Sequence, residues 1–89
     1  MNTILKELKI ARQEKGLNQS EFGNKLGLPQ SHISKIEREE TNPRLSTVID
    51  MARIVDRELM LVPRRLAPVI RTMIDGGHEQ DPMWKPDEG

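Results

Sequence analysis

Residues 19–38 read QSEFGNKLGLPQSHISKIER, and this stretch decides the fold. Its apolar side chains recur at helical spacing on both sides of a turn: Phe22, Leu26, Ile33, Ile36. Asn18 is suited to cap the first of these two segments, and Glu21, three residues later, completes a capping box. Gly27 suits a turn that requires a positive φ. The stretch therefore predicts two short helices joined by a tight turn.

Three further segments outside this stretch have the same helical periodicity. They cover residues 3–15, residues 46–55 with a cap at Ser46, and residues 66–75 before the paired Gly76 and Gly77. Between the last two, Leu59–Val62 is a run of four apolar residues, too short for a helix and typical of a strand. The sequence thus predicts an all-α fold of five short helices with one short C-terminal β-strand.

The predicted strand needs a partner, because backbone N–H and C=O groups along both of its edges are otherwise unpaired. The chain offers no second strand on which it could fold back. Pairing with the same strand of a second copy, across a two-fold axis, satisfies these groups. We therefore expect a homodimer whose interface contains Leu59, Met60, Leu61 and Val62, with the last helix packed beneath the ribbon.

The composition excludes several classes of protein. The 89 residues suffice for one small core, and the absence of cysteine excludes disulfides and thiolate sites. His32 and His78 have no partners at metal-ligand spacing, so we expect no metal, no cofactor and no enzymatic activity. Apolar runs are too short for a signal peptide or a membrane span, which leads us to expect a soluble cytoplasmic protein without a membrane partner.

The charge is unevenly distributed, although 14 basic and 14 acidic residues balance over the whole chain. Residues 1–75 sum to +3 and residues 76–89 to −3. The last segment is also polar and contains prolines, so it should be disordered when unbound. We expect three regions: a helix-turn-helix domain at 1–57, a dimerisation strand and helix at 58–75, and an acidic tail at 76–89.

The second helix of the central stretch has one polar outward face without an acid, formed by Gln30, Ser31, Ser34, Lys35 and Arg38. Two short helices with a glycine-containing turn allow the second helix to enter the major groove of DNA while the first crosses the backbone. Such a face offers donors and acceptors to base edges. It therefore indicates sequence-specific DNA binding, with solvation of exposed polar side chains as the ordinary alternative.

Three phrases carry a family resemblance: ARQEKGLNQSEF at 11–22, GLPQSHISKIER at 27–38 and NPR at 42–44. In this order they resemble the lambda repressor and Cro-like (XRE) helix-turn-helix family over about residues 4–55. Two departures stand out. Gly23 occupies a position where the family usually has alanine, and Glu39 with Glu40 follows the second helix where many members have glycine.

The resemblance assigns roles residue by residue. It implies base contacts by Gln30, Ser31 and Lys35, and an ion pair that orients the reading helix, between Arg12 and Glu37. Backbone contacts are implied for Gln19, Asn42 and Arg44, and we group Arg38 with them. For Arg38 and for Lys25, plain solvation is the alternative, and His32 lies near this face as a contact or as an exposed helix residue.

A weaker resemblance, resting on order and size and on the short apolar strand, is to the antitoxins of HipBA-type toxin–antitoxin modules. It implies an autorepressor that binds a palindromic operator at the nucleoid together with a HipA-type serine/threonine kinase toxin. Trp84 and Met83 lie between prolines in the acidic tail, which suits a partner-binding segment. Trp84 packed on its own domain is the alternative. A stand-alone phage- or host-type repressor, or a protein-neutralising module with a helix-turn-helix scaffold, are the other readings.

Overall fold

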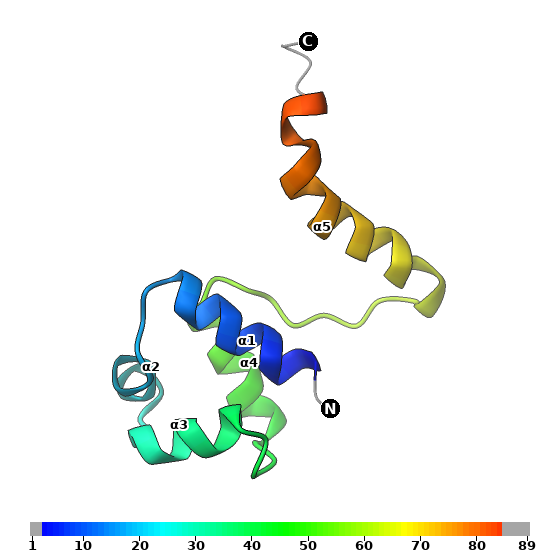
Figure 1. Cartoon of the computed structure of the whole chain (residues 1–89). Helices are drawn as coiled ribbons and strands as arrows, with labels where there is room; N and C mark the ends of the chain where they lie inside the picture. The colour runs from blue at the N-terminus through cyan, green and yellow to red at the C-terminus, as the bar shows by residue number, and fades with distance from the viewer. Residues whose placement is uncertain (1–2, 85–89) are drawn as a thin grey trace. The chain divides into compact units, whose positions relative to one another are not determined.

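The computed structural model describes residues 3–84, and the side chains of residues 4–76 within them. The chain divides into two compact units, residues 1–59 and residues 60–89, called here the N-terminal and the C-terminal unit. The N-terminal unit contains four α-helices: α1 Thr3–Glu14, α2 Gln19–Leu26, α3 Gln30–Glu37 and α4 Leu45–Ile54 (Figure 1). The C-terminal unit contains a 3₁₀ turn, Arg64–Leu66, and α5, Ala67–Trp84. The prediction of five helices is confirmed.

Helix α2, the first helix of the predicted motif, has the N-cap expected from the sequence. The Asn18 side chain accepts a hydrogen bond from the backbone N–H of Glu21 at 2.7 Å, and the Glu21 carboxylate accepts one from the backbone N–H of Asn18 at 2.8 Å. The capping box is therefore confirmed. The expected cap at Ser46 is wrong, because α4 begins one residue earlier, at Leu45, and its N-cap is Arg44.

All four helices of the N-terminal unit are followed by a residue with positive φ within the turn that ends them. These residues are Gly16, Gly27, Glu39 and Asp56, the last two both at 61°. At α3, the N–H of Glu39 bonds to the carbonyl of Ile36 and the N–H of Glu40 to that of Lys35. This pairing satisfies the last carbonyls of the helix, and it normally uses glycine, because glycine has no Cβ to strain. Acidic residues take the glycine position at α3 and α4.

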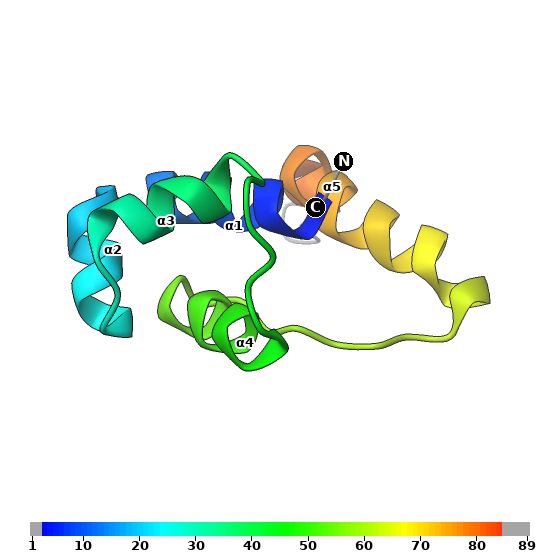
Figure 2. The same ribbon diagram turned by 90° about the horizontal axis from the view of Figure 1, so that it is seen from below.

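The core of the N-terminal unit is built around α2 and α3, which cross steeply (Figures 1 and 2). Phe22, Ile33 and Ile36 are fully buried there. Gly23 permits the crossing, because a Cβ on it would collide with the carbonyl oxygen of Leu28 and come within 3.3 Å of Ile33. Seven further apolar residues complete the core: Leu5, Leu8, Ala11, Val48, Met51, Ala52 and Val55.

Leu59–Val62, which we expect to pair as a strand across a dimer, is irregular in the single chain, where the described residues contain no second strand to pair with it. Leu59 packs against the core of the N-terminal unit, and Met60 and Leu61 are exposed.

The structure corrects the expected end of α5. The helix does not end at Gly76 and Gly77 but continues to Trp84, so residues 76–84 of the expected disordered tail are helical here. Glycine inside a helix costs about 1 kcal/mol relative to alanine, but it removes no hydrogen bond and creates no clash, so a helix already formed continues through it. Residues 85–89 of the tail lie outside the described residues.

Candidate nucleic-acid interface

The predicted base-reading residues lie on the outer side of α3. Gln30, Ser31 and Lys35 are exposed, whereas Ile33 and Ile36 face inward and are fully buried. The helical period of the apolar pair therefore directs the three polar side chains away from the core. Their exposure leaves their polar groups available to a ligand along one helix face.

A buried ion pair holds α1 against α3. Arg12 Nε donates to Glu37 Oε2 at 2.7 Å, and Arg12 Nη2 donates to Glu37 Oε1 at 3.0 Å. The two side chains are only 7% and 3% exposed. Arg12 Nη1 also donates to the carbonyl oxygen of Leu17 at 2.6 Å. The guanidinium thus ties the end of α1, the following loop and α3 together, as the family resemblance implies.

Gln19 extends this network to the reading face. Its Nε2 donates to Glu37 Oε1 at 3.0 Å, and its Oε1 accepts from Gln30 Nε2 at 2.6 Å. The sequence predicts Gln19 as a phosphate contact and does not indicate its contact with Gln30, which the structure shows. The available signal was the placement of Gln19 and Gln30 as the first residues of two consecutive helices that meet in a tight turn.

A second cluster forms where α3 faces the loop before α4. His32, Asn42 and Arg44 line a hollow of about 330 Å³ together with Leu28, Thr41, Pro43 and Thr47. The structure therefore brings both loop residues expected to contact the backbone next to His32 of the reading helix. The N-terminus of α4 begins at this hollow, where Arg44 is the N-cap and forms no side-chain capping hydrogen bond.

Arg38, at the C-terminus of α3, is already engaged within the chain. Its Nε donates to Glu40 Oε2 at 2.8 Å, its Nη2 donates to Glu40 Oε1 at 3.1 Å, and its Nη1 contacts Ser34 Oγ. The hydrogen bonds that Arg38 donates to Glu40 are the largest cause that lowers the pKa of Glu40, and the same bonds raise the pKa of Arg38. The sequence pattern does not predict that Glu40 and Ser34 contact Arg38.

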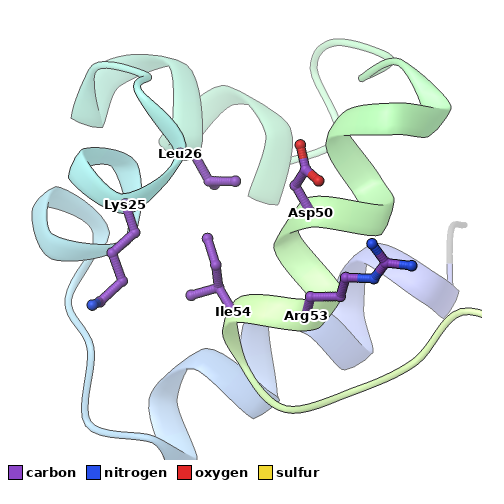
Figure 3. A pocket seen from close by; sticks show the side chains of 5 residues that line it. All are labelled: Lys25, Leu26, Asp50, Arg53 and Ile54. Carbon is purple, nitrogen blue, oxygen red and sulfur yellow. The ribbon is translucent and has the colours of Figure 1, made fainter.

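Lys25 belongs to a different surface. It lines a hollow of about 280 Å³ between α2 and α4, with Leu26, Asp50, Arg53 and Ile54 (Figure 3). In this view Leu26 and Ile54 extend toward each other, while the ammonium of Lys25 points away from them. Lys25 is therefore not grouped with the polar face of α3, and it provides a matched cation for control experiments.

Two further expectations concern the C-terminal tail and membrane segments. The side chains of Met83 and Trp84 lie outside the described part. Across residues 3–84, no helix is both long and apolar enough to cross a membrane.

Comparison with known proteins identifies the family. A family model described as Helix-turn-helix matches residues 8–60. An uncharacterized HTH-type transcriptional regulator of Sinorhizobium fredii, y4dL, is 36% identical over 85 residues, which are 96% of this chain and 43% of that protein. One from Haemophilus influenzae is 33% identical over 63 residues, 71% of this chain and 64% of that protein.

The chain thus spans less than two thirds of either relative's length. No solved structure matches it significantly. The family model covers α2, α3 and α4 completely and the second half of α1, the elements that build the buried pair and the polar face. The chain belongs to the helix-turn-helix family of the lambda repressor and Cro (XRE) type.

Proposed function

We propose that this chain is a sequence-specific DNA-binding transcriptional repressor that acts as a homodimer on a palindromic operator, and not an enzyme. The observation that carries the proposal is the hydrogen-bonded path from the buried Arg12–Glu37 pair through Gln19 to the exposed Gln30. A polar side chain held in this way has lost rotamer freedom before it meets a ligand, which lowers the entropic cost of binding.

The chemistry of the exposed face suits base edges in the major groove. Gln19 takes one N–H of the Gln30 amide, so a second N–H and the Oε1 acceptor remain for bidentate pairing with adenine. The Lys35 ammonium suits guanine O6 and N7, and Ser31 suits several bases. We assign base contact to these three side chains of α3.

Backbone contact is assigned to groups around the same helix. Asn42 and Arg44, at the hollow beside His32, suit a phosphate, which the open N-terminus of α4 also favours. Gln19 is suited to approach a second phosphate from the N-terminus of α2. Residues 1–38 sum to +3, so binding should weaken with salt although the whole chain is neutral.

The exposed apolar residues of the C-terminal unit support a dimer. Met60, Leu61 and Val62 precede α5, which adds Val69, Met73 and Ile74 at helical spacing. Burial of this surface against a second copy would remove it from water. Two reading helices related by a two-fold axis would then contact half-sites one helical turn apart, or a multiple of it. The interface we propose thus extends from Leu59–Val62 along α5.

The base-reading assignment is tested with Gln30→Ala and Lys35→Ala combined in one protein. Selection from a random duplex library by the wild-type chain supplies the operator, and gel shifts then measure affinity for that sequence and for unrelated DNA. We expect the double variant to lose most of the preference for the selected sequence, with Lys25→Ala as the control that keeps it. Unchanged preference in the double variant contradicts the assignment.

We further propose that the protein is the antitoxin and autorepressor of a HipBA-type module, cytoplasmic and located at the nucleoid. Its partner would be a HipA-type kinase encoded next to it, bound through Met83 and Trp84. Co-expression with the neighbouring gene product should give a complex that Met83→Ala with Trp84→Ala weakens and Thr72→Ala does not. Absence of any such complex would leave a stand-alone repressor, or, without operator binding, a scaffold role for the helix-turn-helix.

A further inference from the structure

Arg38 differs from the other described exposed cations of the N-terminal unit, because it donates two hydrogen bonds to one carboxylate of the same chain. The partner Glu40 accepts from Nε at 2.8 Å and from Nη2 at 3.1 Å. The other exposed ion pairs among the described residues of this unit, such as Arg53 with Glu58 at 3.6 Å, are each made by a single nitrogen–oxygen contact. Both partners of the Arg38 pair are about half exposed, at 54% and 53%.

The direction of the guanidinium follows from its third contact. Arg38 Nη1 contacts the hydroxyl of Ser34, one helical turn back along α3. Ser34 lies on α3 between the expected base readers Ser31 and Lys35. The arginine therefore extends back toward the reading face of α3.

The count of donors shows what remains for a ligand. A guanidinium has five N–H donors in one plane, of which Glu40 takes two and Ser34 takes one. One N–H on each terminal nitrogen is left. Two neighbouring donors in a fixed plane match the O6 and N7 acceptors of guanine in the major groove.

We propose, resting on the DNA-binding function above, that Arg38 is a base-reading residue that selects guanine, and that Glu40 is its positioning residue. This replaces the assignment of Arg38 to the phosphate backbone. A phosphate contact would gain from a free, flexible cation, whereas this cation is neutralised by its neighbour and fixed in orientation. Pairing with Glu40 weakens the attraction of the guanidinium to any phosphate. It also fixes the direction of the N–H donors, and discrimination between bases requires a fixed direction.

The surroundings of Glu40 are consistent with this role. Both the Arg38 hydrogen bond and the charge of Lys35 lower the pKa of Glu40, so the carboxylate remains ionised at neutral pH. Glu40 itself follows the turn that ends α3, where its N–H bonds to the carbonyl of Lys35. The carboxylate is thereby attached to the same helix as the arginine that it orients.

The experiment is in vitro selection from a random duplex DNA library by the full-length chain, carried out with the wild type and with Arg38→Lys, Glu40→Gln and Arg53→Lys. Arg38→Lys keeps the charge but not the planar pair of donors. We expect the wild type to require guanine at one position in each half-site, and Arg38→Lys to reduce that preference about tenfold. Arg53→Lys, the matched change in another exposed pair, should leave the profile unchanged.

Glu40→Gln separates the two roles of the arginine. It releases Arg38 without removing it, so we expect weaker preference for guanine together with tighter binding to all sequences. An unchanged base profile in both Arg38→Lys and Glu40→Gln overturns the inference and returns Arg38 to the phosphate backbone, while the proposed repressor function stands. If the wild type selects no sequence at all, the proposed function fails, and the inference fails with it.

Discussion

The two units of the chain differ in whether their apolar side chains are buried or exposed. All ten buried apolar residues of the described part lie between Leu5 and Val55, in the N-terminal unit. Seven of its ten exposed large apolar residues lie between Met60 and Ile74, in the C-terminal unit. The first unit has a closed core of its own, whereas the second is one long helix with a short approach segment.

This difference separates two tasks. An isolated helix is marginal in water, because most helical stability in proteins comes from packing of an apolar face. We therefore expect the N-terminal unit to supply a rigid reading surface and the C-terminal unit to supply the proposed dimer interface. Changes inside the first unit should alter stability, and changes on the face of α5 should alter association.

The largest effect is expected for Arg12→Ala. It leaves the Glu37 carboxylate, 3% exposed, with Gln19 as its remaining side-chain donor. Breaking a buried pair in this way costs about 3–5 kcal/mol of unfolding free energy, measured by urea denaturation. Arg53→Ala, which breaks an exposed pair at 3.6 Å, should cost less than about 1 kcal/mol. Equal losses in the two variants would show that the buried pair does not hold α1 on α3.

A smaller loss is expected for Gly23→Ala, although alanine is the better helix former. The added Cβ meets the backbone carbonyl oxygen of Leu28, which cannot move without opening the turn between α2 and α3. We expect a loss of about 2 kcal/mol, as for overpacked cores. The control is Asn24→Ala, an exposed change on the same helix, which should be neutral or slightly stabilising. A stabilised Gly23→Ala protein would contradict the close crossing.

The C-terminal unit is tested with Val69→Asp and Met73→Asp combined. Both side chains are more than half exposed in the single chain, so the folded N-terminal unit should keep its stability. Charges on the proposed interface should raise the dissociation constant of the dimer at least about tenfold, measured by sedimentation or light scattering. Arg71→Asp, on the side of α5 opposite to Val69 and Met73, is the control, and it makes the same change in net charge. A wild-type chain that is monomeric at high concentration removes the proposed interface.

The contrast between the units also explains what the sequence predicted. In the N-terminal unit, local signals agree with the packing: Asn18 with Glu21 starts α2, Gly27 ends it, and Ile33 with Ile36 faces inward. The family phrases added the Arg12–Glu37 pair. Contacts between side chains of different helices, such as Gln19 with Gln30, carry no periodic signal and required the structure.

The C-terminal unit was predicted less well, because its local signals lack a core to support them. The paired glycines at 76 and 77 indicated a helix end, yet α5 continues to Trp84. Leu59–Val62 indicated a strand from composition alone, and strand pairing depends on a partner that the single chain does not contain. The tendency of glycine to end a helix amounts to only about 1 kcal/mol, so the surroundings of the helix decide whether it stops there.

The smallest effect is expected for Glu39→Gly, and it sharpens the description of the first unit. Glu39 and Asp56 both adopt φ of 61° in the turn that ends a helix, a conformation that strains side chains with a Cβ. Glycine relieves that strain but loses entropy from a more flexible unfolded chain, so we expect a gain of about 0.5 kcal/mol in urea denaturation.

Asp56→Gly is the matched comparison at the end of α4. It relieves the same strain but removes the ion pair with Lys15 Nζ at 3.0 Å, so its gain should be smaller than relief of the strain alone would give. Loss of stability in Glu39→Gly would mean that the carboxylate contributes more than its strained backbone costs. Glycine keeps the backbone hydrogen bonds of this turn, so Glu40 stays in position to orient Arg38. The base profile of Glu39→Gly should therefore match that of the wild type.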